Sequence, residues 1–487
     1  MRETVSAALD DNLAAMEAQF GGDPTLIRRP FCPQNPQGTS VRCCLFCIDG
    51  MVSSSLINQS ILRPVMLLRS GAVGEPLMEE LRMQVVQSCE AKKEGDMAVL
   101  LRAMLYGDSV LFVDGCDRAL LLGTKDFLIR GISEPAGETV LKGPREGYVE
   151  PMLHNLAMLR RRLRTPQLRI EYFTLGGNTG TDCCLCYLEN AVDRQALALL
   201  RRRLASVRID GLLDSNYLAE LVREHRHSLF RTIGSTERPD VTAAKLLEGR
   251  IALFADGSPV AVTVPYLFLE QFQSPEDYYV SPIYAGINRV LRLLGFFSAI
   301  SILPVYLSLV TFHQAFMPLS LILSIAKARQ DVPFSILVES FLLLLAFDIL
   351  WEAGVRTPSN IGQTLSVVGG LVIGQAAVDA RMVSVPVLII VAVSGTCALI
   401  TPKLKAAILV SRLGLTLLGV GFGLYGFLLG LIFFLLMLAR QSSFGVGYLS
   451  HLPLGGTEGS QDSLTRPPLW SMKKYGRFLA WREGLRR

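Results

Sequence analysis

Three carboxylates interrupt one of the most apolar stretches of this chain. Glu339 and Asp348 lie within Pro333–Trp351, and Glu352 follows directly after it. An ionisable side chain at membrane depth costs roughly 2.5–3.5 kcal/mol on insertion scales. Asp348 and Glu352 are four residues apart and share one face of a helix. The pattern predicts a polar path for an ion or substrate; the alternative is interhelical hydrogen bonding that holds a bundle together.

The next apolar stretch, Ile361–Ala380, carries polar groups of its own. Gln363, Gln375 and Asp379 lie within it. Amides are less costly than carboxylates in an apolar setting and often hydrogen-bond between helices. Gln363 and Gln375 therefore join the three carboxylates as candidates for the path or its gate.

Two cysteine clusters are the other groups that could do chemistry. Among ten cysteines, the clustered ones are Cys43, Cys44, Cys47, Cys183, Cys184 and Cys186. A Cys-x-x-Cys pair suggests zinc or redox chemistry, but a zinc site needs a second pair at similar spacing, which the second cluster lacks. Both clusters lie in apolar runs typical of strands, where cysteine packs as a small hydrophobe. We expect structural cysteines and no metal; a metal or redox site is the alternative.

Arrangements typical of catalysis do not emerge elsewhere. Gly176–Gly180 lacks the Lys-Ser/Thr of a phosphate loop, and His225 and His227 lack partners at ligand spacing. The basic cluster Arg160–Arg162 fits either anionic lipid or a solvated helix face. A net charge of +5 is mild for 487 residues and does not indicate nucleic acid. We expect neither an enzyme nor a bound cofactor.

The elements that position these residues divide the chain sharply. The sequence is 50% hydrophobic with a mean hydropathy of +0.37, and the excess lies in residues 288–440. A membrane span needs roughly 20 apolar residues. The segments that qualify are Leu291–Phe312, Pro333–Trp351, Ile361–Ala380 and Val383–Ile400.

Two further apolar segments do not fit a single span. Pro318–Ala328 is too short to cross, and Ala406–Ala439 is too long, so it is either an interfacial helix running into a span or a tight hairpin near Gly419–Gly423. Lys403, Lys405, Arg412 and the basic tail, residues 441–487, favour cytoplasmic positions, and the tail requires an even number of crossings. We expect an all-α polytopic membrane domain of about five or six segments over residues 288–440.

The residues before this region have an ordinary globular composition and an internal likeness. Arg42–Val52 aligns with Asp182–Val192, each an apolar run closed by an acid and a turn residue and followed by a helical pattern. Asp114-Gly115 and Asp256-Gly257 each separate two β-rich runs and predict hairpins. The soluble N-terminal part is therefore α/β, with two related subdomains.

These signals place the boundaries of the soluble part. We expect the cytoplasmic α/β subdomains at residues 38–144 and 145–265. Residues 1–37, with Gly21-Gly22 and several prolines, predict a flexible arm. They lack the charged-then-apolar pattern of a signal peptide, which favours the cytoplasm for the N-terminal part.

Residues 266–287 connect the two parts and predict a coupling elbow. Ser274 precedes Pro275, a favoured first residue of a helix. Glu276 and Asp277 then fall in the first turn, where the helix dipole favours acids. Tyr278 and Tyr279 suit a membrane interface, where the ring lies among headgroups. The alternative is a passive linker.

Several short motifs resemble one family in order along the chain. They are Gly143–Tyr148, Thr236–Asp240, Glu248–Arg250, Phe272–Tyr279, Phe312–Gln314, Gly374–Val378 and Ser443–Gly445. Together they resemble the A subunit of nutrient germinant receptors in the GerA family of spore germination proteins, over about residues 41–454. Departures from the pattern are Ala315 in place of a usual Glu, Arg381 in place of Gly, and Gly447 in place of Pro.

The resemblance implies a multi-pass protein in the inner membrane of the bacterial spore. Such A subunits work with a transporter-like B subunit, which senses nutrient, and a lipoprotein C subunit. The resemblance further implies a homo-oligomeric channel that releases ions and triggers germination. A different reading is a non-conducting scaffold or relay that couples the sensor to separate channels.

Overall fold

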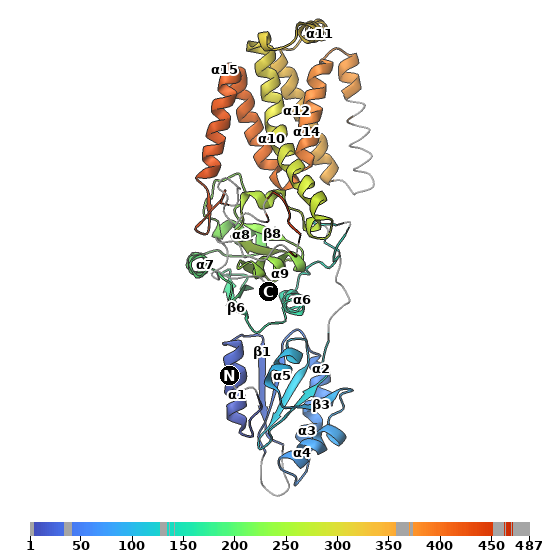
Figure 1. The fold of residues 1–487 in the computed structure, drawn as a ribbon, viewed down its shortest axis with the longest axis vertical. Coiled ribbons are helices and arrows are strands. Elements are labelled where there is room, and N and C mark those ends of the chain that lie inside the picture. The colour runs from blue at the N-terminus through green and yellow to red at the C-terminus, as the bar shows by residue number, and fades with distance from the viewer. Residues whose placement is uncertain are drawn as a thin grey trace.

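The computed structural model describes residues 4–33, 41–126, 134–135, 137–140, 142–356, 370, 374–450, 462, 464–468 and 470. The molecule is elongated: one α/β subdomain lies at one end, a second lies in the middle, and a bundle of helices lies at the other end (Figure 1). The first two parts form the soluble-type region predicted from the sequence, and the third is helical and apolar.

The first subdomain is an antiparallel sheet with strand order β1-β2-β4-β5-β3. Its elements are α1 (Leu9–Phe20), β1 (Leu26–Phe31), β2 (Cys43–Ile48), α2 (Ser54–Leu56), a π-helical stretch at Ile57–Leu62, α3 (Arg63–Leu67), α4 (Glu75–Glu80), a π-helical stretch at Leu81–Val85, β3 (Ala91–Glu94), α5 (Met97–Met104), β4 (Ser109–Val113) and β5 (Ala119–Leu122).

The second subdomain repeats this topology with the order β6-β7-β9-β10-β8. Its elements are α6 (Met152–Arg162), β6 (Leu168–Leu175), β7 (Thr181–Leu188), α7 (Arg194–Ser206), α8 (Ser215–Val222), β8 (Gly234–Thr236), α9 (Pro239–Leu247), β9 (Ile251–Ala255) and β10 (Ala261–Val264). The sheets are built alike, so the prediction of two related subdomains is confirmed, as are both Asp-Gly hairpins.

The prediction of a flexible arm at residues 1–37 is wrong for α1 and β1. Leu9, Leu13, Met16 and Phe20 recur at helical spacing and are buried in the first subdomain. β1 pairs with β2 along its whole length. The double glycine ends a helix here, because Gly21 adopts the left-handed conformation at φ 57° that closes α1. The first subdomain therefore begins well before residue 38.

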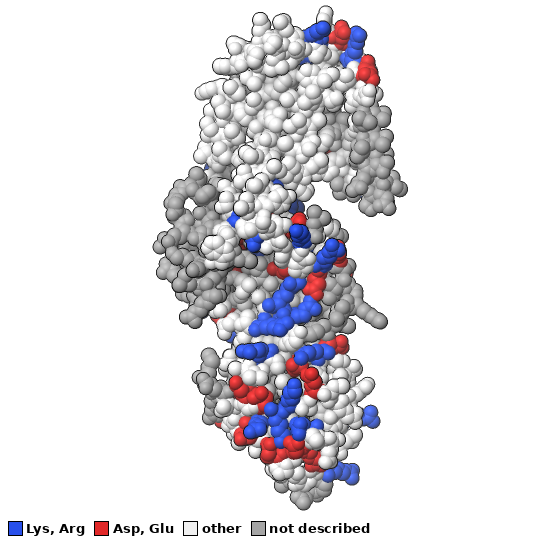
Figure 2. Space-filling view, turned by 45° about the vertical axis from the view of Figure 1, so that its right-hand side comes forward, with Lys and Arg blue, Asp and Glu red and all other residues white. Residues whose placement is uncertain are grey.

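The helical part begins with α10 (Pro282–Phe312), which is followed by α11 (Leu319–Arg329), α12 (Ile336–Arg356), α14 (Val385–Leu399) and α15 (Lys405–Ala439). Two of these segments, Pro282–Phe312 and Pro402–Ala439, are long and apolar enough to cross a membrane. Figure 2 shows a broad band of this part without charged side chains, bounded by charges at its far tip and at the junction with the soluble part.

α15 is a hairpin of two helices rather than one rod. Its backbone leaves helical geometry at Gly423, with φ 64°. A Cβ placed on Gly430 would lie 2.7 Å from the Leu418 side chain and 2.9 Å from that of Leu415. In a continuous helix Leu418 and Gly430 would be about 18 Å apart along the axis. Of the two alternatives for this long segment, the structure shows the hairpin.

Candidate functional site

The segment between the last strand of the soluble part and α10 carries two single helical turns, Phe268–Phe272 and Pro275–Tyr278. We call residues 266–281 the connecting segment. The β-hairpin β11 (Ser442–Ser443) and β12 (Val446–Gly447), which follows α15, packs beside it. Four of the motifs noted in the sequence meet here: Thr236–Asp240, Glu248–Arg250, Phe272–Tyr279 and Ser443–Gly445.

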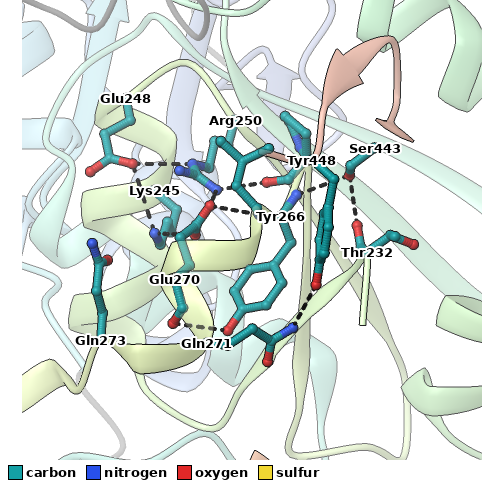
Figure 3. A network of polar contacts seen from close by, with 12 residues as sticks. Thr232, Lys245, Glu248, Arg250, Tyr266, Glu270, Gln271, Gln273, Ser443 and Tyr448 are labelled. Carbon is teal, nitrogen blue, oxygen red and sulfur yellow. Dashed lines mark hydrogen bonds and ion pairs between the residues drawn. The ribbon is translucent and has the colours of Figure 1, made fainter. Parts of the chain in front are cut away.

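A buried group of charges fixes the connecting segment to the second subdomain (Figure 3). Glu270 accepts hydrogen bonds from Arg250 Nη1 and Lys245 Nζ, both at 2.6 Å, and from the backbone of Leu267 at 2.9 Å. Glu248 pairs with Arg250 Nε at 3.1 Å. Burial raises the pKa of Glu270, but the charges and hydrogen bonds of Arg250 and Lys245 outweigh it and bring the pKa to about 2. Glu270 is therefore an ionised, fully partnered anchor.

A second set of hydrogen bonds joins the connecting segment to the chain after α15. Ser443 Oγ accepts from the backbone of Tyr266 at 3.0 Å and donates to the carbonyl of Thr232 at 2.6 Å. Gln271 Nε2 donates to the hydroxyl of Tyr448 at 3.1 Å (Figure 3). Phe444 packs into the core of the second subdomain. The entry to the helical part and the exit from it are thus held at one place.

Aromatic rings fill the space beneath these polar contacts. The cluster comprises Phe230, Phe268, Phe272, Phe296, Phe434 and Tyr448. Its members come from the second subdomain, the connecting segment, α10, the second half of α15 and the final β-hairpin. Neighbouring rings lie 5.2–6.5 Å apart in mostly edge-to-face geometry. The cluster therefore connects these five elements through direct ring contacts.

The predicted helical turn at Pro275 is present, with Ser274 and Asp277 forming a reciprocal cap. Asp277 is 1% exposed and accepts from Arg289 Nε at 3.1 Å and Arg292 Nη1 at 2.9 Å. Both arginines belong to α10. The carboxylate that caps the turn thus also holds the first turns of the helical part.

Tyr278 and Tyr279, predicted to lie at a membrane interface, both hydrogen-bond to protein carboxylates in this structure. Tyr278 donates its hydroxyl to Asp462 at 2.6 Å, and Tyr279 donates to Asp240 of the second subdomain at 2.5 Å. Burial raises the pKa of Tyr278 well above its usual value, and the Asp462 carboxylate adds to that shift. Each hydroxyl has a protein acceptor, so the pair ties the connecting segment to the protein.

A cavity of about 420 Å³ lies at the same junction. Lys403, on the turn between α14 and α15, lines it and pairs with Glu138 at 2.9 Å. Glu138 also accepts from Thr236 Oγ1 at 2.5 Å. The stretch between the two subdomains therefore reaches the helical part as well.

Glu339 lies at the far end of the bundle, fully buried. Its Oε1 accepts from Ser384 Oγ at 2.5 Å and from the Ser384 backbone at the start of α14. Arg329 of α11 lies 3.8 Å from its Oε2. Glu339 thus joins α11, α12 and α14.

Asp348 lies near the other end of α12 and pairs with Arg412 Nη2 at 3.2 Å. Arg412 also contacts Ser394 Oγ of α14 at 3.4 Å. Asp348 and Arg412 line a cavity of about 230 Å³ between α10, α12 and α15. The charge bias of the sequence predicted a cytoplasmic position for Arg412; in the structure its side chain is buried within α15.

The remaining path candidates do not gather around that cavity. Glu352 is exposed and pairs with Arg356 at 2.7 Å and Lys405 at 3.1 Å. Gln375 is exposed on the helical stretch before α14, and Gln363 lies outside the described residues. Among the path candidates that the structure describes, Asp348 lines this cavity, together with Arg412, which the sequence had not suggested as a path residue.

The cysteine clusters lie in the central strands β2 and β7, and all six side chains are buried. Cys43 and Cys47 face one core and Cys44 the opposite one. The Cys44-x-x-Cys47 pair therefore points to two sides of the sheet and cannot share a metal. Burial raises the pKa of Cys43 and of Cys47 to about 12, which keeps them as thiols.

A tandem α/β region joined by a buried junction to apolar helices defines a class of two-part proteins, one part globular and the other helical and apolar. The family model described as "Bacillus/Clostridium GerA spore germination protein" matches residues 14–478. The chain belongs to the GerA family of spore germination proteins, the family of germinant-receptor A subunits.

Two relatives and one solved structure illustrate what this chain is similar to. Spore germination protein KA of Bacillus subtilis is 35% identical over 96% of this chain and 86% of its own length. Uncharacterized membrane protein YfkQ of the same organism is 34% identical over 96% of this chain and 91% of its own. The N-terminal domain of the A subunit of the Bacillus megaterium spore germinant receptor GerK3 is 26% identical, covers 55% of this chain and 98% of that one, and gives a TM-score of 0.41.

Proposed function

We propose that this chain is the A subunit of a nutrient germinant receptor whose helical part crosses the inner membrane of the spore and releases ions when nutrient is sensed. Family membership supports the receptor role. One observation carries the ion path: Asp348 and Arg412 lie on the wall of a cavity between otherwise apolar helices. Charges held at such depth are costly and usually mark a path or its gate.

In this proposal several copies of the chain assemble with the B and C subunits that the family resemblance implies. Large apolar side chains remain exposed along α12, α14 and α15, among them Phe341, Ile389 and Phe433. Lipid and neighbouring helices are the surroundings that suit them. Glu352 and Gln375, exposed in one chain, become candidates for a path lined by several copies.

The test uses spores that carry Asp348→Asn or Arg412→Gln at normal protein level. We expect ion release in response to nutrient to be lost or deregulated. Asp331→Asn serves as the matched control, because Asp331 pairs with Arg381 at an exposed site at the far tip. Ordinary ion release from Asp348→Asn spores would contradict the ion path.

A second candidate is a relay that conducts nothing. It is favoured by the fact that Glu339, Asp348 and Glu352 each have a partner within the chain: Ser384, Arg412 and Lys405. Paired groups can serve only to hold helices together. A current from the purified receptor in a planar bilayer supports the channel, and its absence from a complex that still responds to nutrient supports the relay.

The coupling role of the elbow rests on Asp277, which joins the turn at Pro275 to Arg289 and Arg292 of α10. We expect Asp277→Asn spores to respond poorly to nutrient although the protein accumulates. Glu276→Gln is the matched control, because Glu276 lacks these contacts to α10. We also expect impaired germination from Pro275→Ala. Normal responses to nutrient from both the Asp277 and Pro275 variants would contradict coupling and favour the interpretation of the segment as a passive linker.

A further inference from the structure

A short piece of the C-terminal tail lies against the start of the helical part. Beyond Ser450 the described residues are 462, 464–468 and 470, and Arg466 among them is only 6% exposed. A Cβ on Gly286 of α10 would stand 3.8 Å from the Cα of Thr465. The tail backbone therefore packs directly on the first turns of α10.

Asp462 joins the tail to both elements of the junction. Its carboxylate accepts from the hydroxyl of Tyr278 at 2.6 Å and from Arg289 Nη1 at 2.7 Å. Its carbonyl accepts from Gln273 Nε2 at 2.8 Å. Since Arg289 is 1% exposed and also pairs with Asp277, Asp462 supplies the second carboxylate for a buried charge.

Arg466 provides the complementary contact four residues later. It donates from Nη1 to the carbonyl of Asp277 at 3.1 Å and to that of Val280 at 2.7 Å. Its guanidinium lies 5.7 Å from the centre of the Tyr278 ring, and the guanidinium of Arg289 lies 5.4 Å from the same centre. Asp462 is thus bound by both the connecting segment and α10, and Arg466 by the connecting segment.

We propose that the connecting segment and the first turns of α10 form a groove for a peptide with Asp and Arg four residues apart, and that this chain's own residues 462 and 464–466 occupy it as a strap. The strap holds the elbow on α10 through Arg289, Tyr278 and the carbonyl groups at its end. This docking stands whether or not the helical part conducts ions.

Cross-linking in the full chain tests the docking. Gly286→Cys together with Thr465→Cys places two thiols at a separation that a disulfide bridges. We expect rapid bond formation on mild oxidation, within one chain. The control is Leu294→Cys with Thr465→Cys, because Leu294 lies about 12 Å further along α10. No bond, an equal rate in the control, or a bond between two chains would each overturn the proposal.

Peptide binding tests the recognition. A labelled peptide of residues 460–471 is added to the full chain carrying Asp462→Asn and Arg466→Gln, which weakens the resident strap. We expect binding at least about tenfold tighter than to the unaltered chain, and loss of binding when the peptide carries Arg466→Gln. Equal binding of the peptide to both chains, or no effect of Arg466→Gln in the peptide, would show that the groove does not recognise Asp462 and Arg466.

Discussion

The two α/β subdomains share their strand order and several local contacts, yet they present different residues at the same place. Asp114 accepts from the backbone of Leu9 at 3.1 Å, and its counterpart Asp256 accepts from Met152 at 2.9 Å. Asn12 and Asn155 likewise make equivalent pairs of backbone contacts. Contacts present in both copies are those that build the fold.

The copies diverge at the end of one helix, α5 or α9, and in the loop that leads to the following strand. Lys245, Glu248 and Arg250 of the second copy occupy the places of Ala103, Tyr106 and Asp108 in the first. Tyr106 lies under Arg164 of the second subdomain at 3.8 Å. In each copy this region contacts a residue outside its own subdomain: Arg164 for the first copy and Glu270 for the second. Of the two, the second copy has the cations that bind Glu270.

The largest expected effect comes from breaking the charge group in the second copy alone. Arg250→Met leaves Glu270 buried with one cation fewer, and such losses cost about 3–5 kcal/mol. Asp108→Asn in the first copy breaks a pair whose partner, Lys125, is partly exposed, and should cost about 1 kcal/mol or less. Chemical unfolding of the full chain in detergent, followed by circular dichroism, measures both; equal losses would contradict the distinction.

Acid should act on the second copy through Glu270. Its pKa falls from 4.5 in the unfolded chain to about 2 in the folded protein, so it contributes stability above pH 4.5 that is lost as pH falls towards 2. The contribution is on the order of 3 kcal/mol. We expect Glu270→Gln to reduce the dependence of the thermal midpoint on pH across this window. An unchanged slope would show that other groups dominate acid unfolding.

Substitutions that remove the turn contacts shared by both subdomains should reduce stability equally in each, and by less than the loss of Arg250 or Glu270. Asp114→Ala and Asp256→Ala each remove an acceptor from the first backbone N–H of a helix, which is worth about 1 kcal/mol. Unfolding midpoints of the two variants should move by similar amounts. A much larger loss in one copy would mean that its turn also serves the junction.

Chelation should have the smallest effect. Because Cys44 and Cys47 point to opposite faces of β2, and Cys183 of β7 points away from Cys184 and Cys186, a chelator should leave the thermal midpoint unchanged. Elemental analysis of the purified chain should find no stoichiometric zinc. If the chain contained one zinc that the chelator removed, and the thermal midpoint fell, the prediction of structural, metal-free cysteines would be wrong.

Local sequence patterns predicted the paired subdomains, both hairpins and the apolar helices, because the alternation of apolar and polar residues and the residue types of turns depend on neighbouring positions. The α1 helix was missed although Leu9, Leu13, Met16 and Phe20 have helical spacing, since the glycines and prolines after it suggested an arm. Contacts such as Asp348 with Arg412 or Tyr278 with Asp462 join residues 64 and 184 positions apart. No local pattern specifies such pairs.

The insertion of Phe444 into the second subdomain also sets an order for biosynthesis. All strands of the first sheet have been synthesised once β5 has left the ribosome. The core of the second subdomain also needs Phe444, which is synthesised after the entire helical part. Until then the core around Leu185 and Leu253 lacks one aromatic ring. The core of the middle subdomain is therefore completed only after the whole helical part has been synthesised, so a chain cut short within the helices keeps an unfinished core.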